Sequence, residues 1–117
     1  RSRDNVSILN VDIGGEVGIS TGAGTDVVAL RRSTFAGPVT THLGDGVDIL
    51  SIWDSDFASD AEFYGDRMLD WFWILDSRFD GHVRFDGGHG RDRINHDLTA
   101  RNDLLGGFDA TSFEVHF

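Results

Sequence analysis

Residues 48–53, DILSIW, and residues 70–75, DWFWIL, decide the fold of this chain. Each segment begins with Asp, and apolar residues occupy its third and fifth positions. Such an alternation is typical of a strand with one buried face. The two segments lie 22 residues apart, and residues 26–31, DVVALR, repeat the pattern one step earlier. A match at a fixed step predicts a structural repeat in which similar strands lie one above the other.

The same step of 22 residues recurs along most of the sequence. Four apolar columns follow it: Val6, Val28, Leu50, Phe72 and Ile94; Ile8, Leu30, Ile52 and Ile74; Val17, Val39, Ala61, Val83 and Leu105; and Ile19, Thr41, Phe63 and Phe85. Further columns are Ser33, Ser55, Ser77 and Thr99; Ile13, Phe35, Phe57 and Phe79; and the acidic Asp4, Asp26, Asp48, Asp70, Asp92 and Glu114. A single unit of this kind cannot bury its own inner face, so the units must stack.

We therefore predict an all-β fold, a right-handed parallel β-helix of about five 22-residue coils in a single domain, 1–117. The coils span about 4–25, 26–47, 48–69, 70–91 and 92–113, the last with a C-terminal capping segment. In the second coil we expect strands around 26–31, 33–35 and 39–42. The alternative is a β-sandwich, but sandwiches give no reason for similar residues to recur at one fixed step.

The composition excludes several functions. The chain has 117 residues, with 20 acidic and 10 basic side chains and a net charge of -10, so nucleic acid and anionic membranes are disfavoured as partners. It has neither Cys nor Lys, which removes thiol chemistry and Schiff-base chemistry. No run approaches the roughly 18 apolar residues of a membrane span.

A glycine-aspartate turn precedes the first strand of three coils. The turns are Gly22-Ala23-Gly24-Thr25-Asp26, Gly44-Asp45-Gly46-Val47-Asp48 and Gly88-His89-Gly90-Arg91-Asp92. With Gly87 before it and Arg93-Ile94 after it, the last turn matches the nonapeptide Gly-Gly-x-Gly-x-Asp-x-apolar-x. It resembles the hemolysin-type calcium-binding repeats, called RTX repeats, which form parallel β-rolls.

The RTX resemblance implies calcium as a cofactor and an extracellular or cell-surface location. The implied ligands are the carboxylates of Asp26, Asp48, Asp70 and Asp92 and the turn carbonyls at Gly24, Gly46 and Gly90. The residues also allow a reading without metal, in which each Asp accepts hydrogen bonds from backbone N–H groups of its own turn and Gly supplies the positive φ.

Three tryptophans share one predicted outer face. If Leu50 and Phe72 point inward, the residues between them point outward: Ile49, Ser51 and Trp53 in one coil, and Trp71, Trp73 and Leu75 in the next. Trp71 should lie over Ile49 and under Arg93, and Trp53 beside Leu75. Exposed apolar surface of this kind marks an interaction site. The candidate partners are a protein, through self-association or the remainder of a longer chain, and a glycan that stacks on the rings.

No catalytic residues are predicted. The outward pairs Glu62 with Arg84 and Asp56 with Arg78 are expected to be cross-strand ion pairs, and the five His residues share no metal spacing. We therefore expect an extracellular β-solenoid module with a structural or protein-binding role. A glycan-binding module is the alternative, and a fragment of a polysaccharide-active enzyme comes third.

Overall fold

The computed structural model describes residues 5–67, 70–88, 92–94 and 102–111, and its strands form three parallel five-stranded sheets. The first sheet contains β1 (Asn5–Leu9), β4 (Val27–Arg31), β7 (Asp48–Trp53), β10 (Asp70–Leu75) and β13 (Arg93–Ile94). The second contains β2 (Asp12–Ile13), β5 (Thr34–Phe35), β8 (Asp56–Phe57), β11 (Arg78–Phe79) and β14 (Asp103–Leu104). The third contains β3 (Val17–Ser20), β6 (Val39–His42), β9 (Ala61–Tyr64), β12 (Val83–Asp86) and β15 (Phe108–Thr111).

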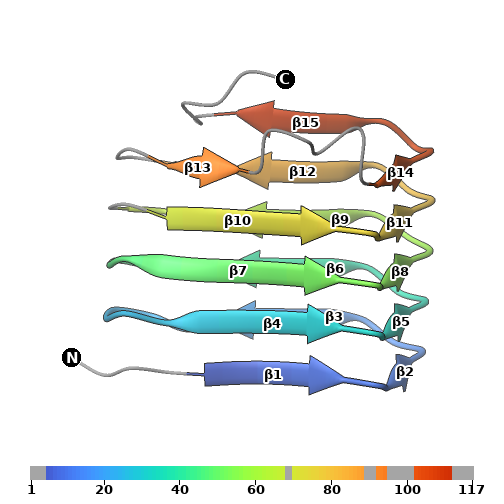
Figure 1. Ribbon diagram of the computed structural model, residues 1–117, viewed down its shortest axis with the longest axis horizontal. Helices are drawn as coiled ribbons and strands as arrows, with labels where there is room; N and C mark the ends of the chain where they lie inside the picture. Colours follow the sequence, from blue (N-terminus) through green and yellow to red (C-terminus); the bar gives the residue numbers. More distant parts are fainter. Residues whose placement is uncertain (1–4, 68–69, 89–91, 95–101, 112–117) are drawn as a thin grey trace.

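The sheets wind into a right-handed β-solenoid of about four turns, as the 22-residue step predicts. In Figure 1 the chain runs along the first sheet at the front, passes through the short second sheet at the side, and returns along the third sheet at the back while it rises. The register is the predicted one through the first four coils, since Val28 pairs with Leu50 and Leu50 with Phe72. None of the described residues is helical.

The predicted apolar columns fill the interior. Leu50, Ile52, Phe72 and Ile74 are buried, while their neighbours on β7 and β10 alternate outward. The aromatic column of the second sheet is a stack, in which the ring centroids of Phe35 and Phe57 are 4.8 Å apart and those of Phe57 and Phe79 4.7 Å. Stacking at the spacing of the strands lets each ring fill the gap above the last.

The fifth coil departs from the predicted register. Val83 pairs with Phe108 rather than with Leu105, which is 62% exposed, so placing Leu105 in the third apolar column was wrong. The connection from Ile94 to Asp103 is three residues longer than the one from Phe72 to Arg78, and this insertion shifts everything after it. Thr99 and Glu114, which the fixed step also aligned, lie outside the described residues.

A column of hydroxyls lines the interior corner between the first and second sheets. The backbone N–H of Ser33 donates to Ser55 Oγ at 3.3 Å, and that of Ser55 donates to Ser77 Oγ at 3.2 Å. Each of these hydroxyls also donates to a carbonyl two residues back. Asn102 Oδ1 accepts the N–H of Ser77 at 2.9 Å and so continues the column in the place predicted for Thr99. This polar column is neutral and fully hydrogen-bonded.

Candidate binding surfaces

The outer face of the first sheet carries the three tryptophans, which we call the tryptophan face together with Ile49 and Leu75. The predicted register is confirmed: Trp71 pairs with Ile49 below it and Arg93 above it, and Trp53 pairs with Leu75. Trp53 is 42% exposed and Trp73 is 43% exposed, while Trp71 and Leu75 are half-buried between them. The period-2 alternation of β7 and β10 forces these side chains outward, because their neighbours fill the interior.

Aromatic rings and guanidinium groups pack together on this face. Trp71 and Trp73 stack with their centroids 5.9 Å apart and their planes inclined by 23°. The Arg93 guanidinium carbon lies 5.5 Å from the centroid of Trp71, and that of Arg31 lies 5.5 Å from the centroid of Trp53. Both distances fall within the range of cation–π attraction, which holds the large side chains in place on a flat sheet. The face is therefore ordered before any partner arrives.

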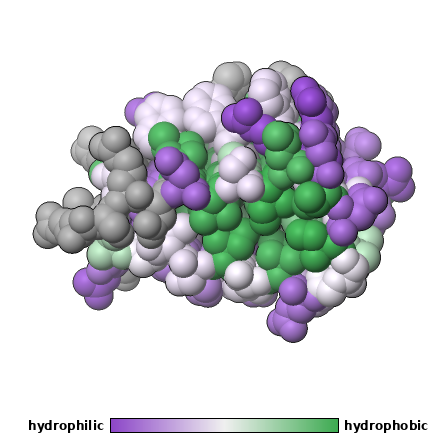
Figure 2. Space-filling view, turned by 90° about the horizontal axis from the view of Figure 1, so that it is seen from below, coloured by the Kyte–Doolittle hydropathy of each residue, from purple (hydrophilic) through white to green (hydrophobic). Residues whose placement is uncertain are grey.

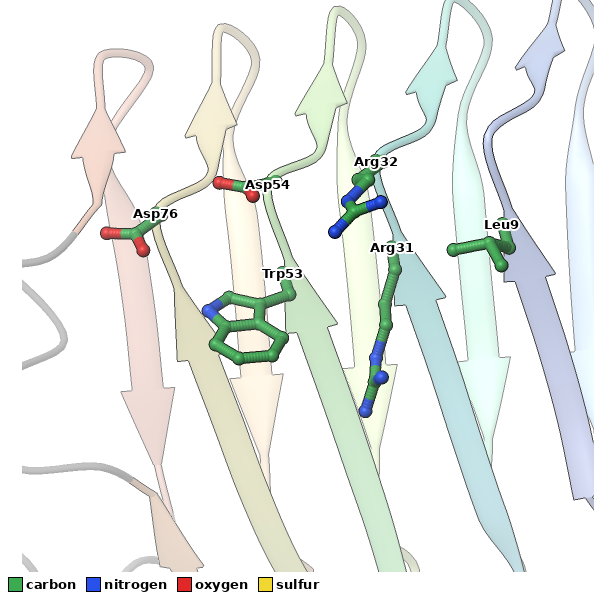
Figure 3. Close-up of a pocket in the computed structure, with 6 residues that line it drawn as sticks. All are labelled: Leu9, Arg31, Arg32, Trp53, Asp54 and Asp76. Atoms are coloured by element: carbon green, nitrogen blue, oxygen red, sulfur yellow. The ribbon is translucent and has the colours of Figure 1, made fainter.

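A hollow of about 350 Å³ lies at one end of this face, where the first sheet turns into the second. It is lined by Leu9, Arg31, Arg32, Trp53, Asp54 and Asp76. Figure 3 shows Trp53 and Arg31 side by side on neighbouring strands, with Arg32, Asp54 and Asp76 along the corner where the strands end. These last three residues take a positive φ of 50–51°, which turns the chain and directs their side chains outward.

The four predicted aspartates form a fully buried column along the opposite interior corner. The N–H of Asp26 donates to Asp48 Oδ1 at 2.9 Å, that of Asp48 to Asp70 Oδ1 at 3.1 Å, and that of Asp70 to Asp92 Oδ1 at 2.8 Å. Each donor belongs to the coil below, so the expectation that each Asp caps its own turn was wrong. The alignment of the column is confirmed, and its carboxylates bind successive coils to one another.

The carboxyls of this column are costly to ionise. Burial raises the pKa of Asp48 to about 7, and the negative charge of Asp26 adds to the shift. Burial raises the pKa of Asp70 to about 9, with Asp92 and Asp48 adding to it. Asp70 therefore keeps its proton at neutral pH and can share it with Asp48. In the ionised state, the Oδ2 atoms of Asp48 and Asp70 are buried without a hydrogen-bond partner.

The glycine-aspartate turns have the expected backbone. Gly24 and Gly46 have φ of 124° and 127°, and a Cβ on Gly46 would lie 1.9 Å from the carbonyl oxygen of Gly24. In the next coil Asp66 takes the place of Gly44 with φ of 69°, and its carboxylate accepts the Gly44 N–H at 3.1 Å. The turns therefore stack closely enough to exclude side chains. Gly90 lies outside the described residues.

The fit of this corner to calcium is partial. Buried carboxylate oxygens are ligands that calcium prefers, and Oδ2 of Asp48 and Oδ2 of Asp70 are available. Two turn carbonyls already accept hydrogen bonds between coils, Asp45 from Gly24 and Gly44 from Arg67. In the part of the chain that the structure describes, no three His, Asp or Glu side chains converge as metal ligands. Calcium binding stays a prediction that rests on the carboxylates.

The predicted outward pairs are register neighbours, but their arginines turn elsewhere. Arg78 lies beside Asp56, and its Nε donates to Asp80 at 2.8 Å. Arg84 lies beside Glu62, and its guanidinium is 3.8 Å from Asp86.

One ionic contact escaped the sequence reasoning altogether. His82 Nε2 lies 3.0 Å from Asp109 Oδ2, and this hydrogen bond raises the pKa of the imidazole. The two residues are 27 positions apart, because the insertion before the fifth coil shifts the register. A search at a fixed step of 22 residues could not have found the pair, since nothing in the sequence marks the insertion.

Comparison of the chain with protein-family models gave no match, and neither the curated proteins nor the solved structures gave one. The likeness to RTX repeats thus rests on the turn residues alone. No helix capable of crossing a membrane occurs among the described residues.

Proposed function

We propose that this chain is a structural β-solenoid module that binds another protein through its tryptophan face. The observation that carries the proposal is the exposure of Trp53 and Trp73 side by side on a flat sheet, each more than two-fifths accessible to water. Leaving such surface in water is unfavourable by about 25 cal/mol per Å². A contiguous apolar patch on a soluble protein is commonly an interaction site.

The chemistry of the face indicates what the partner must offer. Trp and Arg dominate binding energy in protein interfaces, and here Arg31 and Arg93 lie against the rings of Trp53 and Trp71. A suitable partner presents apolar side chains to the indoles and carboxylates to the two guanidinium groups. Because the rings are already packed, little side-chain freedom is lost when the partner binds.

A glycan is the second candidate, and the hollow beside Trp53 favours it. An indole ring, two carboxylates and two guanidinium groups surround this hollow, which is the combination that stacks on a sugar ring and bonds its hydroxyls (Figure 3). The hollow covers only one end of the tryptophan face. A sugar in it would leave Trp71 and Trp73 in water, and for this reason we favour protein.

The test uses two probe sets on the same protein. A library of random peptides displayed on phage and an array of oligosaccharides are applied to the parent chain and to the Trp71→Ser, Trp73→Ser variant. We expect peptides with apolar and acidic residues to be enriched on the parent and lost on the variant. Oligosaccharide binding without peptide enrichment would support the glycan reading, and no enrichment of either kind would contradict the proposal.

We further propose that calcium stabilises the solenoid by binding the carboxylates of the aspartate column, which accords with an extracellular location. A ligand that binds only the folded coils raises their stability by mass action. The melting temperature should rise by several degrees between excess chelator and excess calcium. Asp48→Ala should abolish the rise, and the outward Glu62→Ala should keep it. Equal melting temperatures in calcium and chelator would leave protons as the only neutralising species.

A further inference from the structure

The first coil presents its interior at the N-terminal end of the solenoid. Its inward residues are partly exposed, whereas most of their counterparts one coil later are fully buried. The exposed layer consists of Val6, Ile8, Val11, Ile13, Val17 and Ile19. Figure 2 views the molecule from this end and shows one continuous apolar area at its centre. Within the described residues, β1, β2 and β3 each have a hydrogen-bonded neighbour on one side only.

This end layer is more apolar than the layer that it covers. Val11 stands in the column of Ser33, and Ile19 stands in the column of Thr41. Terminal repeats of a solenoid normally carry a polar outer face, because that face meets water. The first coil has the opposite pattern, with a hydroxyl replaced by an apolar group at two positions. We conclude that the layer is suited to contact with another apolar surface.

We infer that a second copy of this chain covers the layer, with the two copies meeting end to end about a two-fold axis. The axis lies along the viewing direction of Figure 1, so the front sheet of each copy stays at the front. In this arrangement β1 meets the partner's β1 and β3 meets the partner's β3, in both cases antiparallel. Such pairing would satisfy open strand edges that otherwise bond only to water. One patch meets the same patch, as a two-fold interface requires.

The size and charge of the end face are compatible with this dimer. Its cross-section of 32 by 17 Å between Cα atoms gives roughly 500 Å² per copy, hence about 1,000 Å² in all, the low end of specific interfaces. The charged residues described in the first coil are Asp12 and Glu16, which lie at the corner formed by β2. The two-fold axis places this corner against the opposite one, so the carboxylates of the two copies do not meet.

The dimer has a consequence for the tryptophan face, although the inference does not depend on the proposed function. Pairing of β1 with the partner's β1 would join the two first sheets into one continuous sheet. Both tryptophan faces would then lie on the same side of the assembly. A partner with two docking segments could bind both faces, which increases its apparent affinity without any new contact.

Sedimentation velocity over a series of concentrations tests the inference. The parent should convert from monomer to dimer, and Val11→Ser with Ile19→Thr should stay monomeric because these changes restore the residues used by the next coil. The matched control, Trp73→Ser, should dimerise like the parent. A parent that is monomeric throughout would overturn the inference. So would loss of the dimer in Trp73→Ser with retention in the end-layer variant.

Hydrogen exchange on the parent keeps the test decisive if the end-layer variant fails to fold. Amides of β1 and β3 should exchange more slowly at high protein concentration than at low, and those of β7 should not change. Exchange that is independent of concentration in β1 and β3 would overturn the inference, and the end layer would then have an occupant other than a second copy.

Discussion

The two long sheets of the solenoid share one interior but differ on their outer faces. The first sheet shows Trp53, Trp71 and Trp73 to solvent, with Ile49 and Leu75 beside them. At the equivalent outward positions the third sheet shows Thr40, His42, Glu62, Tyr64, Arg84 and Asp86. Both sheets are parallel, both keep the 22-residue register, and both bury the alternate residues. The fold therefore has no need of tryptophan on the outside.

The third sheet is an internal reference for what an ordinary solvated face of this solenoid looks like. Its outward side chains are polar or charged, as solvated strands usually are. The tryptophan face departs from that reference in only two coils, and both arginines that pack on it come from the strands directly flanking them. A departure this local indicates selection for contact with a partner. Several changes test the comparison.

The largest expected effect concerns the shared interior. Phe72 lies beneath the tryptophan face and Phe63 beneath the polar face, and both are almost completely buried. Replacement of either by Ala should lower the free energy of unfolding by about 3–5 kcal/mol, because the stacked coils cannot collapse into the cavity. Urea denaturation should give similar losses for the two variants. A loss on one side only would show that the interior itself distinguishes the sheets.

A second effect comes from the corner that connects the third sheet to the first. The folded-state pKa values of Asp48 and Asp70 are about 7 and about 9, above the ordinary value of 3.8, so the folded state binds protons more tightly. Their contribution to stability is complete below about pH 4 and is lost as pH rises through about 7 and about 9. Without calcium, the melting temperature should fall by several degrees over that range.

The variant Asp70→Asn should flatten this pH dependence, since an amide needs no proton. Ser55→Ala is the matched control at the neutral corner, because it removes a buried hydrogen-bonding group of the other column and leaves the pH dependence unchanged. A profile that stays steep in Asp70→Asn would mean that the aspartate column is not what titrates.

The smallest expected effect is that of the outer faces on stability. Trp73→Thr on the first sheet and Arg84→Thr on the third each change an outward residue, so each should alter the free energy of unfolding by less than about 1 kcal/mol. Thermal denaturation of the two variants provides the measurement. A large loss in Trp73→Thr alone would mean that the indole holds the fold together, which would remove the argument for a partner.

Much of this architecture is predictable from sequence, because a solenoid repeats its physics in every coil. The columns through Leu50 and Phe57 must be apolar wherever a coil is covered on both sides, and this requirement makes the 22-residue step visible. The outward direction of Trp71 follows from the same alternation.

The rest depends on contacts that no single coil encodes. Three additional residues move Phe108 into the position expected for Leu105 and bring Asp109 to His82. The aspartates were aligned correctly, but their hydrogen-bond donors lie in the neighbouring coil and are therefore invisible in the turn sequence. The apolar end layer at Val11 becomes meaningful only once the structure shows that it is uncovered within the described residues.

The comparison of the two faces is tested most directly by the affinity of one enriched peptide for three proteins. Fluorescence anisotropy compares the parent with the Trp71→Ser, Trp73→Ser variant and with Glu62→Ala, Arg84→Ala on the third sheet. Removal of two central indoles should weaken binding by at least about 30-fold, as expected for residues that dominate an interface. The third-sheet variant should bind like the parent. Equal weakening by both variants, or by neither, would contradict the assignment of the tryptophan face as the binding surface.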